Sequence, residues 1–294
     1  MKLLFAVLGI AALYGAMVVV LYRRTDYYKS TKNPYLTVRF DAGRMGEYLI
    51  YKYLRDYEKD GAKFLYNCYL PKNQEETTEI DVLMIHTSGI YVFESKNYSG
   101  WIFGSEKQKT WTQSLPSGNK SKKEHFLNPI MQNNLHIKCL KEYIGEDYPI
   151  HSIIVFSERC TLKQINLVSD DIKVIKRDQV WQTVKQVEHQ SENRISQEHI
   201  LSIYKKLYPL TQVSDSVKEK HIEDIKTAHT KETVGDDTEK TDENVLMQTG
   251  SELVCPRCGG TLVLRTTKRG ENAGKQFYGC SNYPKCRYMK NVEQ

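Results

Sequence analysis

Two apolar segments that carry unexpected charge limit the fold of this chain more than any other feature. Residues 79–100 read EIDVLMIHTSGIYVFESKNYSG, and the apolar halves meet at Thr87-Ser88-Gly89. Runs of β-branched and aromatic residues on both sides of a turn predict a β-hairpin. Their apolar density is typical of strands that are covered on both faces, where unpaired charge is costly. The charged residues inside the runs therefore require a partner.

The expected turn fixes how these charges are arranged. If Ser88 and Gly89 are the central turn residues, Asp81 lies opposite Lys96 and diagonal to Glu94. All three side chains then share one face of the hairpin. The alternative is an ordinary surface ion pair without a catalytic role, because a Glu-x-Lys pair in a strand usually lies on a solvated face.

The three charges fit a metal site. Two carboxylates that are close together in a partly buried place repel each other, and a divalent cation removes this penalty. Mg²⁺ is commonly held by one or two carboxylates together with water and phosphate oxygens. Lys96 beside such a cation would orient or deprotonate a water and stabilise charge on a phosphate. This is the arrangement of metal-assisted phosphodiester hydrolysis.

Three ordered motifs carry a family resemblance. They are GRMGE (43–47), EIDVLMIHTSGIYVFESKNYSGWIFG (79–104) and NPIMQNNLHIKCL (128–140). Together they resemble the nuclease-related domain family, NERD, which is itself similar to the restriction-endonuclease-like PD-(D/E)xK fold. The proline of that motif is absent, and Ile80 stands in its place.

The resemblance implies a site of five residues. Asp81 and Glu94 would bind Mg²⁺ or Mn²⁺, Lys96 would be the catalytic lysine, and Glu47 and Gln132 would complete the site. Taken alone, Glu47 also suits the first turn of a helix. Gln132 by itself fits a surface amide, and only the family resemblance places it in the site.

His136 lies one helical turn beyond Gln132 on the same face. It is either a packing residue at the edge of the core or a phosphate contact.

Helical and strand patterns alternate along the chain. We expect helices at about 43–57, 129–144, 178–187 and 196–207, and strands at 63–69, 80–85, 90–95, 100–103, 110–113, 151–157 and 172–176. This order predicts an α/β fold with a restriction-endonuclease-like mixed sheet flanked by helices.

An uncharged run, LLFAVLGIAALYGAMVVVLY, occupies residues 3–22. An α-helix of about 20 apolar residues crosses a bilayer, whereas a cleaved signal peptide has a shorter apolar region. One basic side chain precedes the run and four follow it closely: Arg23, Arg24, Lys29 and Lys32. We therefore expect residues 1–24 to form a single-pass anchor in the cell membrane, with the soluble domains facing the cytoplasm.

Four of the seven cysteines cluster at the end of the chain. The spacing Cys255-x2-Cys258, 21 residues, then Cys280-x5-Cys286 is typical of a structural Zn²⁺ site with four thiolates. An odd number of thiols is a poor disulfide framework and suits a reducing compartment. Metal binding would supply much of the folding free energy of so small a unit.

The same segment resembles the zinc ribbon at the C-terminus of bacterial type IA DNA topoisomerases, through CPRCGG, LVLR and FYGCSNYPKC. The resemblance implies binding of single-stranded DNA. Basic and aromatic residues interleave here, as phosphate neutralisation and base stacking require. The candidate contacts are Arg265, Lys268, Arg269, Tyr278, Tyr283 and Arg287, although some of the aromatic side chains could instead fill the ribbon core.

Residues 211–250 contain 10 acidic and 5 basic residues and no aromatic residue. Such a segment buries too little surface to offset the entropy of ordering. We therefore divide the chain into the anchor (1–24), a nuclease-related domain (36–208), a flexible acidic linker (209–250) with a possible helical start, and the ribbon (251–294).

These features together predict a membrane-anchored, metal-dependent DNA nuclease whose ribbon holds single-stranded DNA. The alternative is a non-catalytic, membrane-tethered DNA-binding or scaffold protein with a degraded nuclease core. A third possibility is a sensor of anionic lipid that is indifferent to DNA.

Overall fold

The computed structural model describes residues 2–73, 76–117, 120–145, 147–192, 194–235, 257, 262–266, 276–280, 286 and 288–291. The chain divides into two compact units, Met1–Thr233 and Val234–Gln294. Each unit is described by itself.

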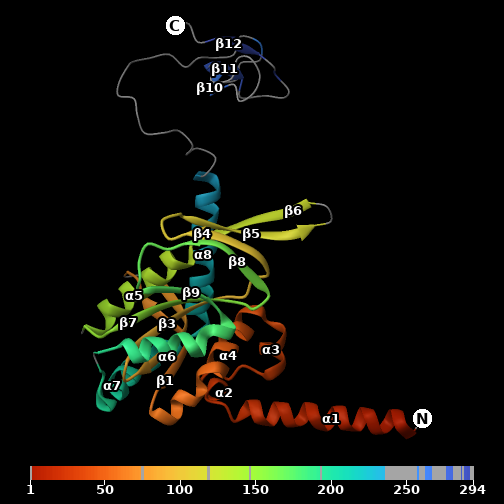
Figure 1. Ribbon diagram of the computed structural model, residues 1–294, viewed down its shortest axis with the longest axis vertical. Coiled ribbons are helices and arrows are strands. Elements are labelled where there is room, and N and C mark those ends of the chain that lie inside the picture. Colours follow the sequence, from red (N-terminus) through yellow and green to blue (C-terminus); the bar gives the residue numbers. More distant parts are fainter. Residues whose placement is uncertain are drawn as a thin grey trace. The chain divides into compact units, whose positions relative to one another are not determined.

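The first unit is a mixed α/β fold, as the sequence predicts, but it has two sheets flanked by helices rather than the single mixed sheet that was expected (Figure 1). Its helices are α1 (Lys2–Arg23), α2 (Asp26–Thr31), α3 (Tyr35–Phe40), α4 (Ala42–Leu54), α5 (Pro129–Ile144), α6 (Val180–Gln190), α7 (Gln197–Leu207) and α8 (Asp215–Gly235). Short 3₁₀ turns span Arg55–Asp60, Arg177–Gln179 and Tyr208–Thr211.

The central sheet has the strand order β1-β2-β3-β7-β9. Its strands are β1 (Lys63–Pro71), β2 (Thr77–His86), β3 (Gly89–Lys96), β7 (Ile150–Phe156) and β9 (Ile172–Lys176). The β1–β2 and β2–β3 pairs are antiparallel, whereas the β3–β7 and β7–β9 pairs are parallel.

Both faces of this sheet are buried. Helices α4 and α6 supply Ile50, Leu54 and Val184 to the cluster on one face, and helices α5 and α7 supply Leu140 and Ile200 to the cluster on the other. Burial on both faces explains why β2 and β3 read as nearly continuous apolar runs.

The second sheet has the order β6-β5-β4-β8. Its strands are β4 (Gly100–Ser105), β5 (Thr110–Ser117), β6 (Lys120–Leu127) and β8 (Cys160–Asn166). Ile102 and Trp111 on one face of this sheet pack with Ile154, Phe156 and other residues of the central sheet and α5. The β5–β6 hairpin projects from the unit (Figure 1).

Helix α5 begins and ends where its local sequence dictates. The Asn128 side chain accepts a hydrogen bond from the Ile130 N–H at 2.9 Å, and Pro129 occupies the first turn. Gly145 ends the helix with a φ of 73°. An Asn cap, a proline at the start and a left-handed glycine at the end are the signals that helix termini favour.

The membrane anchor and the assignment to the cell membrane are wrong. The apolar run does form a helix, α1, but in the part of the chain that the structure describes no helix has the length and apolar character of a membrane span. The end of α1 instead belongs to the folded unit, because Tyr22 is buried and its ring contacts those of Tyr28, Tyr35 and Tyr48.

Part of the expected linker is helical. Helix α8 covers Asp215–Gly235, and its His221 is buried against the Tyr69 ring at 5.4 Å. The His221 Nδ1 atom lies 3.1 Å from the Thr77 hydroxyl. One buried histidine thus docks a segment whose composition is otherwise that of a solvated chain.

The second unit contains one antiparallel sheet of three strands, β10 (Leu262–Thr266), β11 (Gln276–Cys280) and β12 (Met289–Asn291). Cys286 is buried, and Tyr278 and Tyr288 pack against it. The side chains of Cys255, Cys258 and Cys280 lie outside the described residues, as do those of Arg265, Lys268, Arg269, Tyr283 and Arg287.

Candidate active site

The candidate site lies where β2 separates from β3, beside an irregular position in the β1–β2 pairing. Tyr66 pairs with Val82 and Cys68 with Ile80, but the register skips Asn67, whose φ is +50°. Tyr66 and Val82 pack with the α4/α6 cluster, whereas Cys68 and Ile80 pack with the α5/α7 cluster. Strict alternation would keep Tyr66 and Cys68 on one face, so both strands change faces at this step.

Asp81 occupies this step in β2, opposite Asn67. On its other side, the last β2–β3 pair is Val82 with Phe93. Beyond that pair a side chain replaces the backbone as hydrogen-bond acceptor, because Asp81 Oδ2 accepts a hydrogen bond from the Ser95 N–H at 2.8 Å. A strand that leaves its ladder here exposes the carboxylate to groups on both faces of the sheet.

The expected hairpin register is wrong by two residues. His86 pairs with Gly89, so Thr87 and Ser88 form the turn. The ladder ends at Val82 and Phe93, and the next residues on the two strands are Asp81 and Glu94 rather than Asp81 and Lys96. A shift of two residues leaves every side chain on its expected face. The two carboxylates are therefore closer neighbours than the sequence suggested.

Opposed electrostatic effects act on these two carboxyl groups. Burial and the neighbouring Glu94 and Glu47 raise the pKa of Asp81 well above its ordinary value. Burial also acts on Glu94, but the Lys96 ammonium and the His136 hydrogen bond outweigh it and lower the pKa of Glu94 to about 2. One carboxylate is thus charged and the other favours its proton, as expected when two close carboxyl groups share one ammonium.

Lys96 supplies that ammonium. Its Nζ lies 2.6 Å from Glu94 Oε1. Burial lowers the pKa of Lys96, but Glu94 and Asp81 together raise it above its ordinary value. Lys96 therefore holds its proton firmly.

His136 fixes the other oxygen of Glu94. Its Nε2 lies 3.0 Å from Glu94 Oε2, and its Nδ1 lies 2.7 Å from the Thr78 hydroxyl. A carboxylate only accepts hydrogen bonds, so Nε2 carries the proton, and in a neutral ring Nδ1 accepts from Thr78. Both oxygens of Glu94 are thereby oriented by partners from β3 and α5.

Glu47 approaches from α4, on the side opposite His136. Its Oε2 accepts hydrogen bonds from Tyr27 at 3.4 Å and from Asn67 at 3.3 Å. Burial, and then Glu79, raises the pKa of Glu47 to about 7. Glu47 and Glu79 line a cavity of about 390 Å³. Glu47 acts on Asp81 through its charge, which is one of the causes that raise the pKa of Asp81.

Several buried polar atoms have no hydrogen-bond partner in the structure. They include Ser95 Oγ, next in the chain to Glu94, Gln132 Oε1, one turn before His136 in α5, and Tyr66 Oη, from a residue that lines the cavity beside Glu47. Buried oxygens without partners are rare and require an explanation, such as a water or an ion. Over the described residues, however, no three His, Cys, Asp or Glu side chains are grouped closely enough to hold a metal by themselves. The donors that fit a cation here are two carboxylates, supported by an amide oxygen and completed by water or phosphate.

Comparison with known proteins now adds to this geometry. A family model described as a nuclease-related domain matches residues 42–157. An uncharacterized protein of Bacillus anthracis is 30% identical over 180 residues, which cover 61% of this chain and 82% of that protein. The chain belongs to the nuclease-related domain family.

The second unit has its own relatives. Residues 252–294 match a model described as a topoisomerase DNA-binding C4 zinc finger. DNA topoisomerase 1 of Helicobacter pylori is 49% identical over 39 residues, and that of Archaeoglobus fulgidus is 52% identical over 40 residues. These segments cover 13% and 14% of this chain but only 5% of each topoisomerase. No solved structure matches the chain.

Sequence reasoning missed Thr78 and Asn67. The sequence did contain an indication for Asn67, because it is the one amide side chain within the apolar segment KFLYNCYL. No local pattern indicated Thr78, since its role depends on His136, which is 58 residues away in the chain.

Proposed function

We propose that this nuclease-related protein is a divalent-metal-dependent nuclease that hydrolyses phosphodiester bonds of DNA. The observation that carries the proposal is the meeting of Asp81, Glu94 and Lys96 where β2 and β3 separate. Such a group is costly to bury without a ligand, and Mg²⁺ or Mn²⁺ removes that cost. The nuclease-related family supports the same activity.

Each residue has a role that follows from its contacts. Asp81 and Glu94 would hold the cation, with Glu47 and the Gln132 amide oxygen as neighbouring acceptors. The bound cation would polarise the phosphate and lower the pKa of a water. Because Lys96 holds its proton firmly, it serves as a positive charge that stabilises the phosphate in the transition state rather than as a general base.

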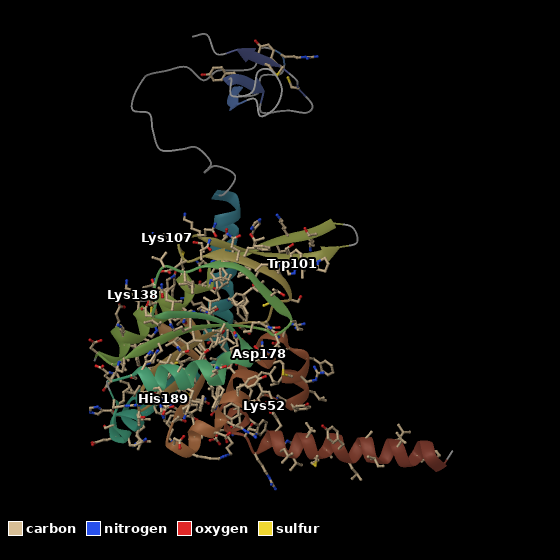
Figure 2. All side chains as sticks on the ribbon, in the orientation of Figure 1. Lys52, Trp101, Lys107, Lys138, Asp178 and His189 are labelled. Atoms are coloured by element: carbon tan, nitrogen blue, oxygen red, sulfur yellow. The ribbon has the colours of Figure 1, made fainter. Side chains whose placement is uncertain are left out.

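The test is cleavage by the purified full-length chain of labelled single-stranded, duplex and flapped DNA. We expect cleavage with Mg²⁺ or Mn²⁺, no cleavage without them, and loss of cleavage in Asp81→Asn. Asp178→Asn is the matched control, since Asp178 is an exposed carboxylate that is not among the candidate site residues; Figure 2 labels it.

The rival function is non-catalytic DNA binding or scaffolding by a degraded nuclease core. The observation that favours it is that, among the described residues, no three His, Cys, Asp or Glu side chains are grouped closely enough to hold a metal by themselves. Salt-sensitive DNA binding with no cleavage under either metal would support this rival.

The ribbon would deliver DNA to the site. We propose that Cys255, Cys258, Cys280 and Cys286 bind one structural Zn²⁺ and that the ribbon (251–294) binds single-stranded DNA. It would follow the nuclease-related domain (36–208) and the acidic segment (209–250). Candidate contacts remain Arg265, Lys268, Arg269, Tyr278, Tyr283 and Arg287, although the packing of Tyr278 against Cys286 gives this side chain a structural role as well.

A further inference from the structure

The second sheet has one face in the core and one face toward solvent. Ile102 and Trp111 are fully buried on the inner face. Trp101, next to Ile102 in β4, points the other way and is 51% exposed. A single exposed aromatic side chain is ordinary on a protein surface, so its neighbours decide whether this face can bind a partner.

The strand register aligns other side chains with Trp101. Trp101 pairs with Ser114 of β5, and Ser114 pairs with Lys123 of β6, so the three residues form one row by register, in which Trp101 and Lys123 are exposed and Ser114 is buried. On the other side, the β4–β8 register shifts next to Ile102, and Lys163 Nζ lies 5.3 Å from the centre of the Trp101 ring. The exposed ring therefore has one lysine over it and another two strands away.

The charge of this face has one sign. Within the described residues of the four strands, the only acidic side chain is Glu124. The register directs Glu124 to the opposite face from Lys123, and its carboxylate pairs with Lys122 at 2.6 Å. The outer face thus combines lysines and an aromatic ring without a competing carboxylate.

This combination matches the chemistry of a nucleic-acid strand, in which phosphates alternate with bases that stack on aromatic rings. We propose that the outer face of the second sheet binds a single-stranded segment of DNA, with Trp101 stacking on a base and Lys123 and Lys163 neutralising phosphates. Figure 2 labels Trp101 on this sheet.

The outer face lies close to the candidate active site along the chain. The interpretation of the bound DNA as a substrate rests on the proposed nuclease function. Trp101 follows Lys96 by five residues, a distance of at most about 18 Å along an extended chain. A strand held by Trp101 would thus be within reach of Asp81 and Glu94.

The test reads Trp101 directly, so that DNA binding by the ribbon does not obscure the result. In a Trp181→Phe background the remaining tryptophans are Trp101 and the buried Trp111. Titration with a single-stranded oligonucleotide, without added Mg²⁺ or Mn²⁺, should quench the emission of Trp101. Adding Trp101→Phe should remove this quenching while the chain stays folded, as judged by circular dichroism.

Affinity provides the second measurement. We expect Trp101→Ala to weaken binding of the oligonucleotide by about tenfold. Trp181→Ala should have no effect, because Trp181 is similarly exposed, at 48%, but lies on α6. The slope of the logarithm of the binding constant against the logarithm of the salt concentration should become shallower by about 1.4 in the Lys123→Gln, Lys163→Gln double variant. The same slope should not change in the Lys52→Gln, Lys138→Gln double variant, which serves as the control.

The outcomes separate this inference from the nuclease proposal. Quenching and weakened binding in a chain that never cuts DNA would support the surface and reject the nuclease. Cleavage by a chain in which Trp101 is not quenched, or in which the Trp101→Ala and Trp181→Ala variants bind equally, would overturn the surface. Binding of duplex alone would also overturn it, because paired bases leave no face for Trp101.

Discussion

Two Glu/Lys pairs in neighbouring sheets have the same spacing and the same contact distance. Glu94 and Lys96 lie two residues apart in β3, and Lys122 and Glu124 lie two residues apart in β6; each pair is 2.6 Å apart. The Lys96 and Glu94 side chains are 17% and 5% exposed, whereas those of Lys122 and Glu124 are 67% and 44% exposed. The motif is thus repeated, and burial is what differs.

Each pair also has a nearby threonine–histidine contact. Thr78 contacts His136 at 2.7 Å beside Glu94, and both are buried. Thr112 contacts His125 at 3.2 Å in the second sheet, where His125 is exposed. Only the buried set includes an additional carboxylate, Asp81, whose pKa is raised by burial and by Glu94. A Glu-x-Lys motif becomes a candidate site through this environment rather than through its spacing.

The largest expected difference between the two pairs is in cleavage. Glu94→Gln should reduce the metal-dependent rate by roughly 10³-fold, because it removes a charged metal ligand. Folding should survive, since Asp81 can ionise and pair with Lys96 once Glu94 is neutral. Single-turnover cleavage of labelled DNA measures the rate.

Glu124→Gln is the matched control for that experiment, and its rate should stay within about threefold of wild type. Similar losses in the two variants would mean that the buried pair has no special role in the reaction.

The two Glu/Lys pairs should also differ in how much each contributes to the free energy of unfolding. Lys96→Met leaves Glu94 buried without its ammonium and should lower the free energy of unfolding by about 3 kcal/mol. Lys122→Met should change it by less than about 1 kcal/mol, since solvent screens an exposed pair. Urea unfolding at neutral pH without divalent ions measures both, and equal changes would contradict the argument from burial.

The sequence predicted the proximity of the three charges but not their register. Gly89 was expected at the centre of the turn, where glycine is usual. It instead begins β3 with a φ of 140°, and a Cβ there would lie 2.5 Å from the His151 ring. The glycine is required by the close approach of β7, a contact that links residues 62 apart and leaves no local pattern.

Helix α5 shows the opposite case. Its bounds, Pro129–Ile144, agree with the expected range because Asn128, Pro129 and Gly145 are local signals. The change of faces at Asn67 and Asp81 could not be predicted, since it depends on how two strands pack against helices on both sides of the sheet. Helix α8 was expected only as a possible helical start of the linker, because its docking depends on His221, a buried side chain among its described residues.

A smaller effect should follow from His136. His136→Ala removes the hydrogen bond that orients Glu94 Oε2 and should weaken Mn²⁺ binding by about 10- to 100-fold, as is typical of residues that support metal ligands. His136→Gln should recover part of the loss, because its amide can still donate. Calorimetric titration of Mn²⁺ measures the affinity, with the exposed His125→Ala as the control.

The smallest expected difference concerns the two threonines. Thr78→Val keeps the shape of the side chain but leaves His136 Nδ1 buried without its partner, which should cost about 1 kcal/mol, or roughly fivefold in Mn²⁺ affinity. In Thr112→Val the Nδ1 of the exposed His125 can bond to water instead, so Mn²⁺ affinity should not change. If Thr78→Val also has no effect although His136→Ala does, the imidazole is held by packing alone. The orientation of Glu94 would then depend on where α5 lies rather than on a chain of hydrogen bonds from β2.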